Sequence, residues 1–196
     1  MDFKGYDKLI AFGDPQLAQK PQQFDFEKED AKALEEHLYE RQLHFQGAGL
    51  SANQLGIDRA VFTMTVGDEF KRCMFNPVLL AVSDKTVPIK EGCLSFPGLW
   101  LVISRPEDAT FRYMDSNGEE QVEKFVDVAA RIALHEFDHM LGKNFTQRAS
   151  RLKIERAVKA LDKKVKKFKR NQNAYQQLLQ NINRIEETDN DEWFRF

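Results

Sequence analysis

Only two of the 196 residues are cysteine, Cys73 and Cys93, and they lie far apart in the chain. Small secreted domains that depend on disulfides carry many closely spaced cysteines. This scarcity therefore argues against a disulfide framework and favours a reducing compartment. Each thiol is then expected to be either buried or functional.

Long apolar runs and a charge excess are also missing. The first residues, MDFKGYDKLIAFGD, never give the uninterrupted apolar stretch that a signal peptide or a membrane span requires. Lys and Arg number 29 against 31 Asp and Glu, so the chain as a whole does not have the charge of a generic nucleic-acid or membrane binder. We expect a soluble, cytoplasmic protein with no membrane partner, built as one ordinary domain plus an appended segment.

Hydrophobic spacing predicts both helices and strands. Residues 26–45 carry apolar residues at spacings near three and four, which is typical of an amphipathic helix. Residues 60–127 contain short β-branched and aromatic runs, which are typical of strands. An Asn-Gly dipeptide within SNGE accepts positive φ at both positions, and it predicts an antiparallel hairpin across residues 109–126.

A second helix is predicted for VAARIALHEFDHM, which is apolar on nearly every side and is therefore expected to be buried. Asp127 precedes it as a candidate N-cap, and Gly142 is well placed to end it. These patterns together predict an α+β fold in which mixed antiparallel strands partly enclose this central helix.

HEFDH, residues 135–139, places two imidazoles four positions apart on that helix. Positions i and i+4 share one helical face, so His135 and His139 can aim a ring nitrogen at the same point. Glu136 lies beside that point and can serve as general base for a metal-bound water, which is the logic of the HExxH motif. By itself the motif leaves a second interpretation, two partly buried histidines that happen to share a face.

A third ligand decides between these interpretations, because a catalytic divalent ion generally takes three protein ligands. The extended protease motif needs a histidine at position 145, where this chain has Phe145. Glu155 lies in a basic segment, and His37 and His44 lie on the early helix. Cys93 remains, inside EGCLSFPG, and a thiolate is a good ligand for zinc or iron.

Three stretches resemble the signature motifs of the peptide deformylase family, in the same order: GAGLSANQLG at 47–56, EGCLSFPG at 91–98 and HEFDHMLG at 135–142. The resemblance extends to FGDP at 12–15, FNP at 75–77 and RP at 105–106, and so covers roughly residues 8–155. It implies hydrolysis of the N-formyl group from the formylmethionine that begins a new polypeptide, with release of formate.

The resemblance also implies a site. Cys93, His135 and His139 would hold one divalent metal ion, naturally ferrous iron in the family, although zinc or nickel can occupy the same ligands. Glu136 would take the proton of a water activated by the metal. The Gln54 side-chain amide and the Leu94 backbone N–H would stabilise the negative charge on the formyl oxygen.

The substrate would lie extended against the first two motifs, in the manner of an added strand. Its methionine side chain would enter a pocket on the central helix. The substrate-binding residues implied are Ala48, Gly49, Leu50, Gly92, Val128 and Ile132. Glu91 and Arg105 match an ion pair that braces the cysteine loop.

Three positions depart from the family pattern. Leu134 stands where many relatives have glutamine, so we expect a lost polar contact to tune the activity without abolishing it. Ser51 replaces a common alanine, a small change. Arg131 stands one turn before His135, where relatives are usually apolar, and the sequence leaves open whether it reaches the pocket mouth or points to water.

Residues 148–196 are predicted to form a basic, helical extension to a catalytic domain at 1–147. Between Arg148 and Arg170, Glu155 and Asp162 are the only acids among many Lys and Arg residues. Apolar residues continue at alternating spacings of four and three, which is the seam of a coiled coil or a helical hairpin. In position and charge the extension resembles the helix with which bacterial deformylases dock on the ribosome; self-association through the seam is the alternative.

Two other functions stay open from the sequence. An HExxH metalloprotease would cleave internal peptide bonds, and a non-catalytic ribosome-binding module would hold a structural metal. A structural site is normally closed by four protein ligands, and the sequence offers three, which favours catalysis.

Overall fold

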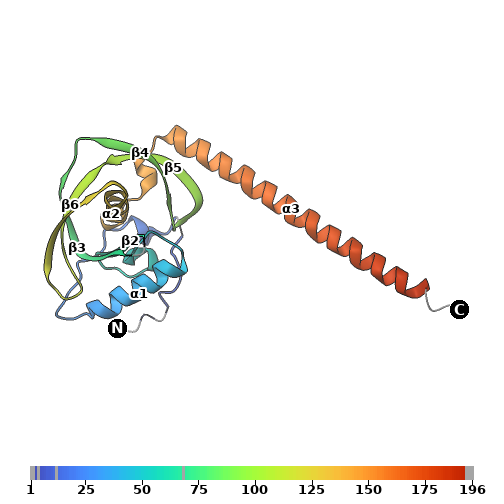
Figure 1. Ribbon diagram of the computed structural model, residues 1–196, viewed down its shortest axis with the longest axis horizontal. Helices are drawn as coiled ribbons and strands as arrows, with labels where there is room; N and C mark the ends of the chain where they lie inside the picture. Colours follow the sequence, from blue (N-terminus) through green and yellow to red (C-terminus); the bar gives the residue numbers. More distant parts are fainter. Residues whose placement is uncertain (1–2, 4, 12, 68, 193–196) are drawn as a thin grey trace. The chain divides into compact units, whose positions relative to one another are not determined.

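Antiparallel strands surround a central helix in the computed structural model, which describes residues 3, 5–11, 13–67 and 69–192 (Figure 1). The larger sheet has the order β1-β2-β3-β6-β7, with strands Gly49–Ser51, Val61–Val66, Phe70–Val82, Asp108–Met114 and Glu120–Val126. A separate two-stranded sheet is formed by β4 (Thr86–Cys93) and β5 (Phe96–Pro106). The predicted α+β class is confirmed.

The predicted hairpin is formed by β6 and β7, which pair from Asp108 opposite Val126 to Met114 opposite Glu120. Its turn differs in detail from the expected one. Gly118 has a positive φ of 77°, but Asn117 does not, and the turn instead spans residues 115–119. The Asp115 carboxylate accepts hydrogen bonds from the backbone N–H groups of Asn117 and Glu119, which stabilises this wider turn.

The central helix α2 (Asp127–Met140) packs against strands of both sheets. Its expected burial is confirmed, but the predicted N-cap is wrong. Val126 occupies the N-cap without a side-chain hydrogen bond, and Asp127 is the first helical residue, with a φ of 50°. Gly142 ends the helix as predicted, with a φ of 65°. A Cβ there would also lie 2.6 Å from the carbonyl oxygen of Ala18, so glycine is required twice over.

The first helix, α1 (Ala31–His44), begins later than the predicted residue 26 because Asp30 caps it. The Asp30 carboxylate accepts a hydrogen bond from the backbone N–H of Ala33 at 3.0 Å. Leu34 and Leu38 are buried beside Leu50 and Phe75 in one core cluster. α1 thereby supports the short strand β1, which leads directly to the site.

Strand β5 alternates buried and exposed residues over most of its length, as expected for a strand with one face on the core. Leu99, Leu101, Ile103 and Arg105 share the buried face. The strand period thus carries one arginine inward beside α2, where Arg105 is 1% exposed.

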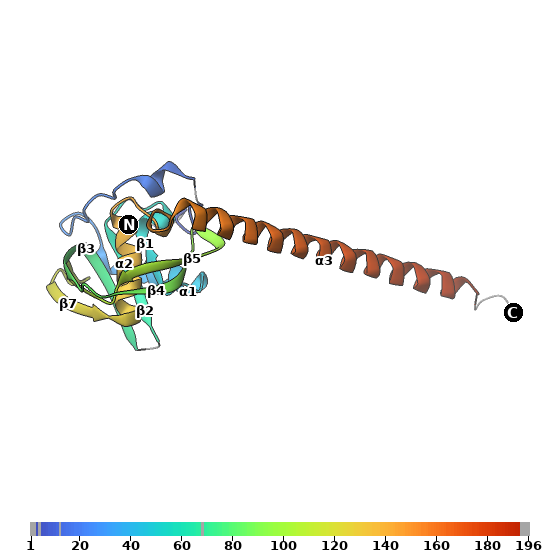
Figure 2. The same ribbon diagram turned by 90° about the horizontal axis from the view of Figure 1, so that it is seen from above.

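The chain divides into two units, Met1–Ile154 and Glu155–Phe196. The helix α3 (Arg151–Glu192) is continuous across the described part of the extension, as Figure 2 shows, so a long helix is confirmed and a helical hairpin is wrong there. Residues 193–196 of the predicted extension lie outside the described residues. Among the described helices, none combines the length and hydrophobicity needed to cross a membrane.

The described chain also contains three short 3-10 helices, η1 (Pro15–Ala18), η2 (Ala52–Leu55) and η3 (Phe145–Arg148). η2 follows β1 without a break and carries Gln54. η3 follows α2 and contributes the buried Phe145, whose ring centroid lies 5.8 Å from that of His135. The position given to a third histidine in the protease motif is therefore occupied by an aromatic packing residue.

Candidate metal centre

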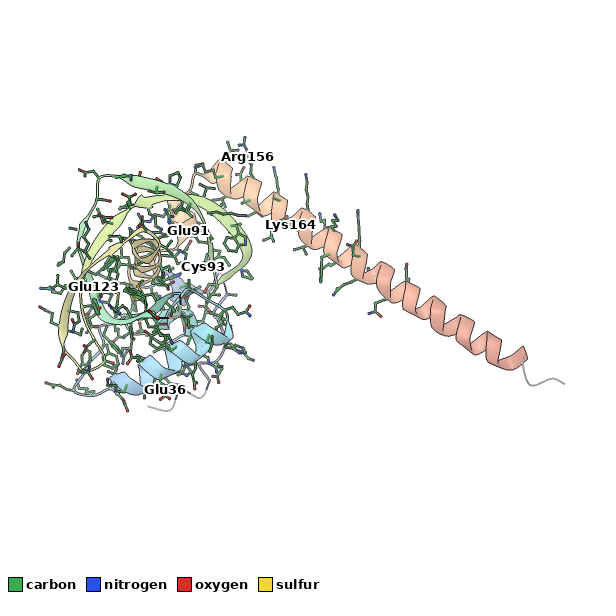
Figure 3. All side chains as sticks on the ribbon, in the orientation of Figure 1. Glu36, Glu91, Cys93, Glu123, Arg156 and Lys164 are labelled. Carbon is green, nitrogen blue, oxygen red and sulfur yellow. The ribbon has the colours of Figure 1, made fainter. Side chains whose placement is uncertain are left out.

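Cys93, His135 and His139 converge from two elements of the fold. Their possible ligand atoms all lie within 4.8 Å of one another. Cys93 ends β4, and the two histidines lie one turn apart on α2, which directs both rings to the same side. The Cys93 sulfur is 3.5 Å from Nε2 of His139. Figure 3 shows Cys93 and Glu91 beside α2.

The rings are oriented so that they can bind a metal. Nδ1 of His135 lies 3.1 Å from Oε2 of Glu91, which leaves Nε2 free to face the centre. His139 is 1% exposed, and its Nδ1 has no hydrogen-bond partner among the described residues. One thiolate and two imidazoles form a donor set that suits zinc or ferrous iron. The residues therefore fit a divalent metal ion.

The electrostatics of the cluster favour a cation. Burial lowers the pKa of His135, but the hydrogen bonds with Cys93 and Glu91 outweigh burial and raise it to about 10. Burial and the neighbouring His135 lower the pKa of His139 to about 3, so its ring is neutral at pH 7, the form that binds metals. A proton and a metal ion would compete to supply the positive charge that the surroundings of His135 stabilise.

Glu136 lies beside the cluster and is 4% exposed. Burial raises the pKa of its carboxyl to about 7, although the nearby His135 opposes the shift. Its Oε2 has no hydrogen-bond partner among the described residues. Gly49 allows this close packing, because a Cβ at that position would lie 2.6 Å from Oε1 of Glu136. A carboxyl with a pKa near 7 can accept and return a proton at neutral pH.

The Gln54 amide is held in one orientation. Its Oε1 accepts hydrogen bonds from the backbone N–H and the hydroxyl of Ser51, both at 3.0 Å. Its Nε2 therefore faces the centre, 3.4 Å from the Cys93 sulfur and 3.2 Å from Oγ of Ser95. Leu94 follows Cys93 at the turn into β5 and lines the same cavity. The roles of Ser51 and Ser95 were not evident from the sequence, because they depend on side-chain orientation.

Glu91 and Arg105 form the predicted ion pair, and it is buried. Nε of Arg105 donates to Oε1 of Glu91 at 2.7 Å, and Nη2 donates to Oε2 at 3.0 Å. Burial raises the pKa of Glu91, but the bonds from His135 and Arg105 outweigh it and lower the pKa to about 2. Glu91 is therefore ionised at neutral pH and holds the ring of His135.

Asp138 is a member of this network that the sequence analysis missed. It is 0% exposed and accepts a hydrogen bond from Nη1 of Arg105 at 2.9 Å. Arg148, on η3, donates to the same carboxylate from Nε at 3.0 Å. Burial raises the pKa of Asp138, but Arg148 and Arg105 together lower it. The available signal was a carboxylate on a helix expected to be buried, since buried carboxylates need cationic partners.

Arg131 does not point to water. It is 8% exposed and lines the cavity beside the centre. Its guanidinium donates to Oε1 of Glu91, to the carbonyl of Val87, and to the carbonyl of Ile103 at 3.1 Å. Leu134 is 6% exposed and packs in the core, where a glutamine side chain would be buried.

A cavity of about 600 Å³ opens beside the cluster. Five of the six predicted substrate-binding residues line it: Ala48, Gly49, Gly92, Val128 and Ile132. Leu50 does not, because its side chain points into the core and is 0% exposed. Sequence reasoning missed a set of apolar wall residues, which are Ile89, Phe96, Leu99 and Trp100.

The other candidate ligands lie elsewhere. His37 contacts the carbonyl oxygen of Tyr6 at 3.2 Å and stacks on Phe3, and His44 is exposed. Cys73 is a buried core residue, and burial raises the pKa of its thiol well above the usual value. This thiol therefore packs as a small apolar group.

Comparisons with known proteins show the family of the chain. The family model of polypeptide deformylase matches residues 6–155. The peptide deformylase of Pseudothermotoga lettingae is 36% identical over 135 residues, which cover 69% of this chain and 78% of that protein. That of Thermotoga maritima is 32% identical over 163 residues, which cover 82% of this chain and 99% of that protein.

Solved structures of peptide deformylases are also similar to this chain. The crystal structure of the Thermotoga maritima peptide deformylase has a TM-score of 0.70 and 34% identity, covering 73% of this chain and 97% of that one. A peptide deformylase from Synechococcus elongatus in complex with actinonin has a TM-score of 0.74 and 27% identity, covering 79% of this chain and 85% of that one. The chain therefore belongs to the peptide deformylase family.

Proposed function

We propose that Cys93, His135 and His139 hold the divalent metal ion with which this protein removes the formyl group from N-formylmethionine at the start of new polypeptides. Deformylation is the known activity of the family, and its members are metal-dependent hydrolases. One observation carries the assignment to these residues. One sulfur and two imidazoles lie within 4.8 Å of one another, and the buried carboxyl of Glu136 lies beside them.

We propose ferrous iron as the native metal, with zinc or nickel able to bind the same residues. When bound, such a cation lowers the pKa of a water and polarises the formyl carbonyl. The bond between Glu91 and Nδ1 of His135 supports this role because it fixes the ring with Nε2 toward the cluster.

Glu136 is the proton carrier in this proposal. It takes the proton of the attacking water as a C–O bond forms at the formyl carbon. It then gives the proton to the amine nitrogen as the C–N bond breaks, which releases formate and a free amino terminus. Two features support both transfers at neutral pH: its pKa of about 7, and its Oε2, which accepts no hydrogen bond from the described residues.

Fixed donors stabilise the charge that grows on the formyl oxygen. We assign this role to the side-chain amide of Gln54 and the backbone N–H of Leu94. The two bonds that Ser51 makes to Oε1 of Gln54 support the assignment, because a turned amide would place its NH2 group against the backbone N–H of Ser51, which can only donate. The donor is thus positioned before the substrate arrives.

The peptide is proposed to bind as an extended strand along Ala48, Gly49 and Gly92. β1 lies at the edge of its sheet, and β4 pairs only with β5 among the described strands, so both have an edge that can pair with a peptide. The methionine side chain enters the cavity between Val128 and Ile132, whose apolar surfaces suit it.

The test is formate release from a formyl-Met peptide by protein loaded anaerobically with ferrous iron, or with nickel. Oxygen is excluded because a ferrous centre with a thiolate ligand oxidises. Glu136→Gln is expected to lower kcat by about 10²- to 10⁴-fold, because it removes the proton carrier. Glu123→Gln, a change on β7 away from the cavity, is the matched control and should retain wild-type activity. A metallated wild type that releases no formate would refute the proposal.

We also propose that α3 contacts ribosomal RNA. Its described side chains are mostly exposed, and Figure 3 shows Arg156 and Lys164 on it. A basic helix of this kind can neutralise phosphates, which makes binding fall steeply as salt rises. The exposed apolar residues Leu152, Val158, Val165 and Phe168 favour the alternative, self-association of two copies.

Ribosome co-sedimentation over a range of salt concentrations distinguishes RNA binding by α3 from self-association. Four lysines of α3 are replaced by glutamine: Lys163, Lys164, Lys166 and Lys167. This variant should lose binding at a lower salt concentration than the wild type. A control variant changes four exposed lysines of the first unit, which are Lys8, Lys20, Lys71 and Lys124. Equal loss in both variants would contradict RNA docking by α3, and a dimer in light scattering would favour self-association.

A further inference from the structure

Arg131 makes contacts that neither deformylation nor the ion pair between Glu91 and Arg105 requires. It lies on α2 four positions before His135, so both side chains leave the same face of the helix. Both reach Glu91 on the facing strand β4. Oε1 of Glu91 accepts from Arg131, and Oε2 lies 3.1 Å from Nδ1 of His135.

The guanidinium of Arg131 also spans the two-stranded sheet. It donates to the carbonyl of Val87 on β4 and to that of Ile103 on β5, the latter at 3.1 Å. Its side chain is 10% exposed, and that of Glu91 is 6% exposed. A buried guanidinium is stable only where acceptors satisfy its donors, and here a carboxylate and two backbone carbonyls do so.

Arg105 alone does not give each buried carboxylate a guanidinium of its own. Arg105 is shared, because it pairs with Glu91 at 2.7 Å and with Asp138 at 2.9 Å. Two buried carboxylates therefore face one shared guanidinium at the centre of the network. Arg148 supplies a further guanidinium at Asp138, and Arg131 supplies one at Glu91, whose other oxygen faces His135.

We propose that Arg131 is a positioning residue that fixes the Glu91 carboxylate and, through it, the ring of His135. The Arg131 guanidinium donates hydrogen bonds to Glu91 and to the carbonyls of Val87 and Ile103, so its effect on His135 passes through Glu91. This inference rests on the proposed function, in which His135 is a ligand. The stem of Arg131 also lines the cavity, and a role limited to that wall is the competing explanation.

The experiment compares Arg131→Met, which keeps the length of the stem and removes the guanidinium, with wild type. Each protein is loaded with cobalt. The rate at which cobalt passes from the protein to an excess of chelator is measured, and the absorption spectrum of the bound cobalt is recorded. We expect Arg131→Met to release cobalt about 10-fold faster and to show an altered spectrum, because loss of a group that holds a metal-binding histidine weakens metal affinity about 10- to 100-fold. The kcat for a formyl-Met peptide should fall while KM stays within about twofold, since the cavity wall keeps its stem.

Arg112→Met is the matched control, because Arg112 lies on β6 with a side chain that is 49% exposed. If Arg131→Met does not fold, Arg131→Gln, which keeps a donor for the strand carbonyls, is judged by the same criteria. Wild-type cobalt release and spectrum in the folded variant would overturn the proposal, and so would a raised KM as the only change. A wild type that binds no cobalt and releases no formate would instead refute the proposed function, so the two failures are distinguishable.

Discussion

The buried arginines of the first unit and the basic residues of α3 differ in their surroundings. In the first unit, Arg105 and Arg131 are buried, and each donates to Glu91. In the second unit, the described Lys and Arg residues of α3 are exposed to solvent. Removing a guanidinium from water is costly, so a buried one persists only where carboxylates and carbonyls accept its hydrogen bonds. Changes to the buried set should therefore act on stability and site geometry, whereas changes to α3 should act on partners.

The largest effect on stability is expected from replacing Arg105, which pairs with both Glu91 and Asp138. Arg105→Met removes the partner common to Glu91 and Asp138 and leaves both carboxylates buried. We expect the free energy of unfolding to fall by about 3–5 kcal/mol, measured by urea denaturation. Arg112→Met removes an exposed pair with Glu120, whose atoms lie 3.9 Å apart, and should cost about 0–1 kcal/mol. Equal losses in the two variants would contradict the comparison.

Low pH should weaken the ion pairs of Glu91 without a mutation, because it protonates the carboxylate. The pKa of Glu91 is about 2 in the folded protein against a usual value of 4.5, so its ionised form is bound more strongly in the folded state. This stabilisation is present above pH 4.5, is lost as the pH falls toward 2, and amounts to about 3 kcal/mol at neutral pH.

The measurement is urea denaturation of wild type and Glu91→Gln between pH 7 and pH 3. The difference in unfolding free energy between them should shrink by about half or more over this range, because the wild type loses its charged Glu91. Glu120→Gln, in the exposed pair, should differ from wild type by less than about 1 kcal/mol throughout. A difference for Glu91→Gln that does not change with pH would show that Glu91 is not the titrating group.

The sequence predicted the parts of this protein that repeat or lie close together in the chain. The helical period of HEFDH placed two histidines on one face, and the β-branched runs marked the strands. The boundaries were less accurate, because Asp30 begins α1 and Val126, not Asp127, caps α2. Asp30 caps α1 through its carboxylate, whereas Val126 caps α2 without a side-chain bond, so residue type alone does not identify the first residue of a helix.

The sequence could not predict which buried arginines and carboxylates pair with one another. From the sequence, the Arg131 side chain could point to water or reach the pocket mouth. Only the position of β4 beside α2 decides that it reaches Glu91. Asp138 was overlooked because its partners Arg105 and Arg148 lie 33 and 10 positions away. Leu50 was predicted to bind the substrate, and its side chain packs in the core because neighbouring residues of a strand point to opposite faces. Side-chain direction and long-range pairing are properties of the assembled fold.

The smallest effect is expected from the exposed charges. The variant with glutamine at Lys163, Lys164, Lys166 and Lys167 should unfold within about 0.5 kcal/mol of wild type, because exposed substitutions away from packed features change stability little. Its rate of formate release from a short formyl-Met peptide should also be unchanged, since none of these lysines lines the cavity. The checks are urea denaturation and steady-state kinetics. A loss above about 1 kcal/mol would mean that α3 contributes to the folded core of the first unit, and the division of basic residues into positioning and partner-binding sets would then fail.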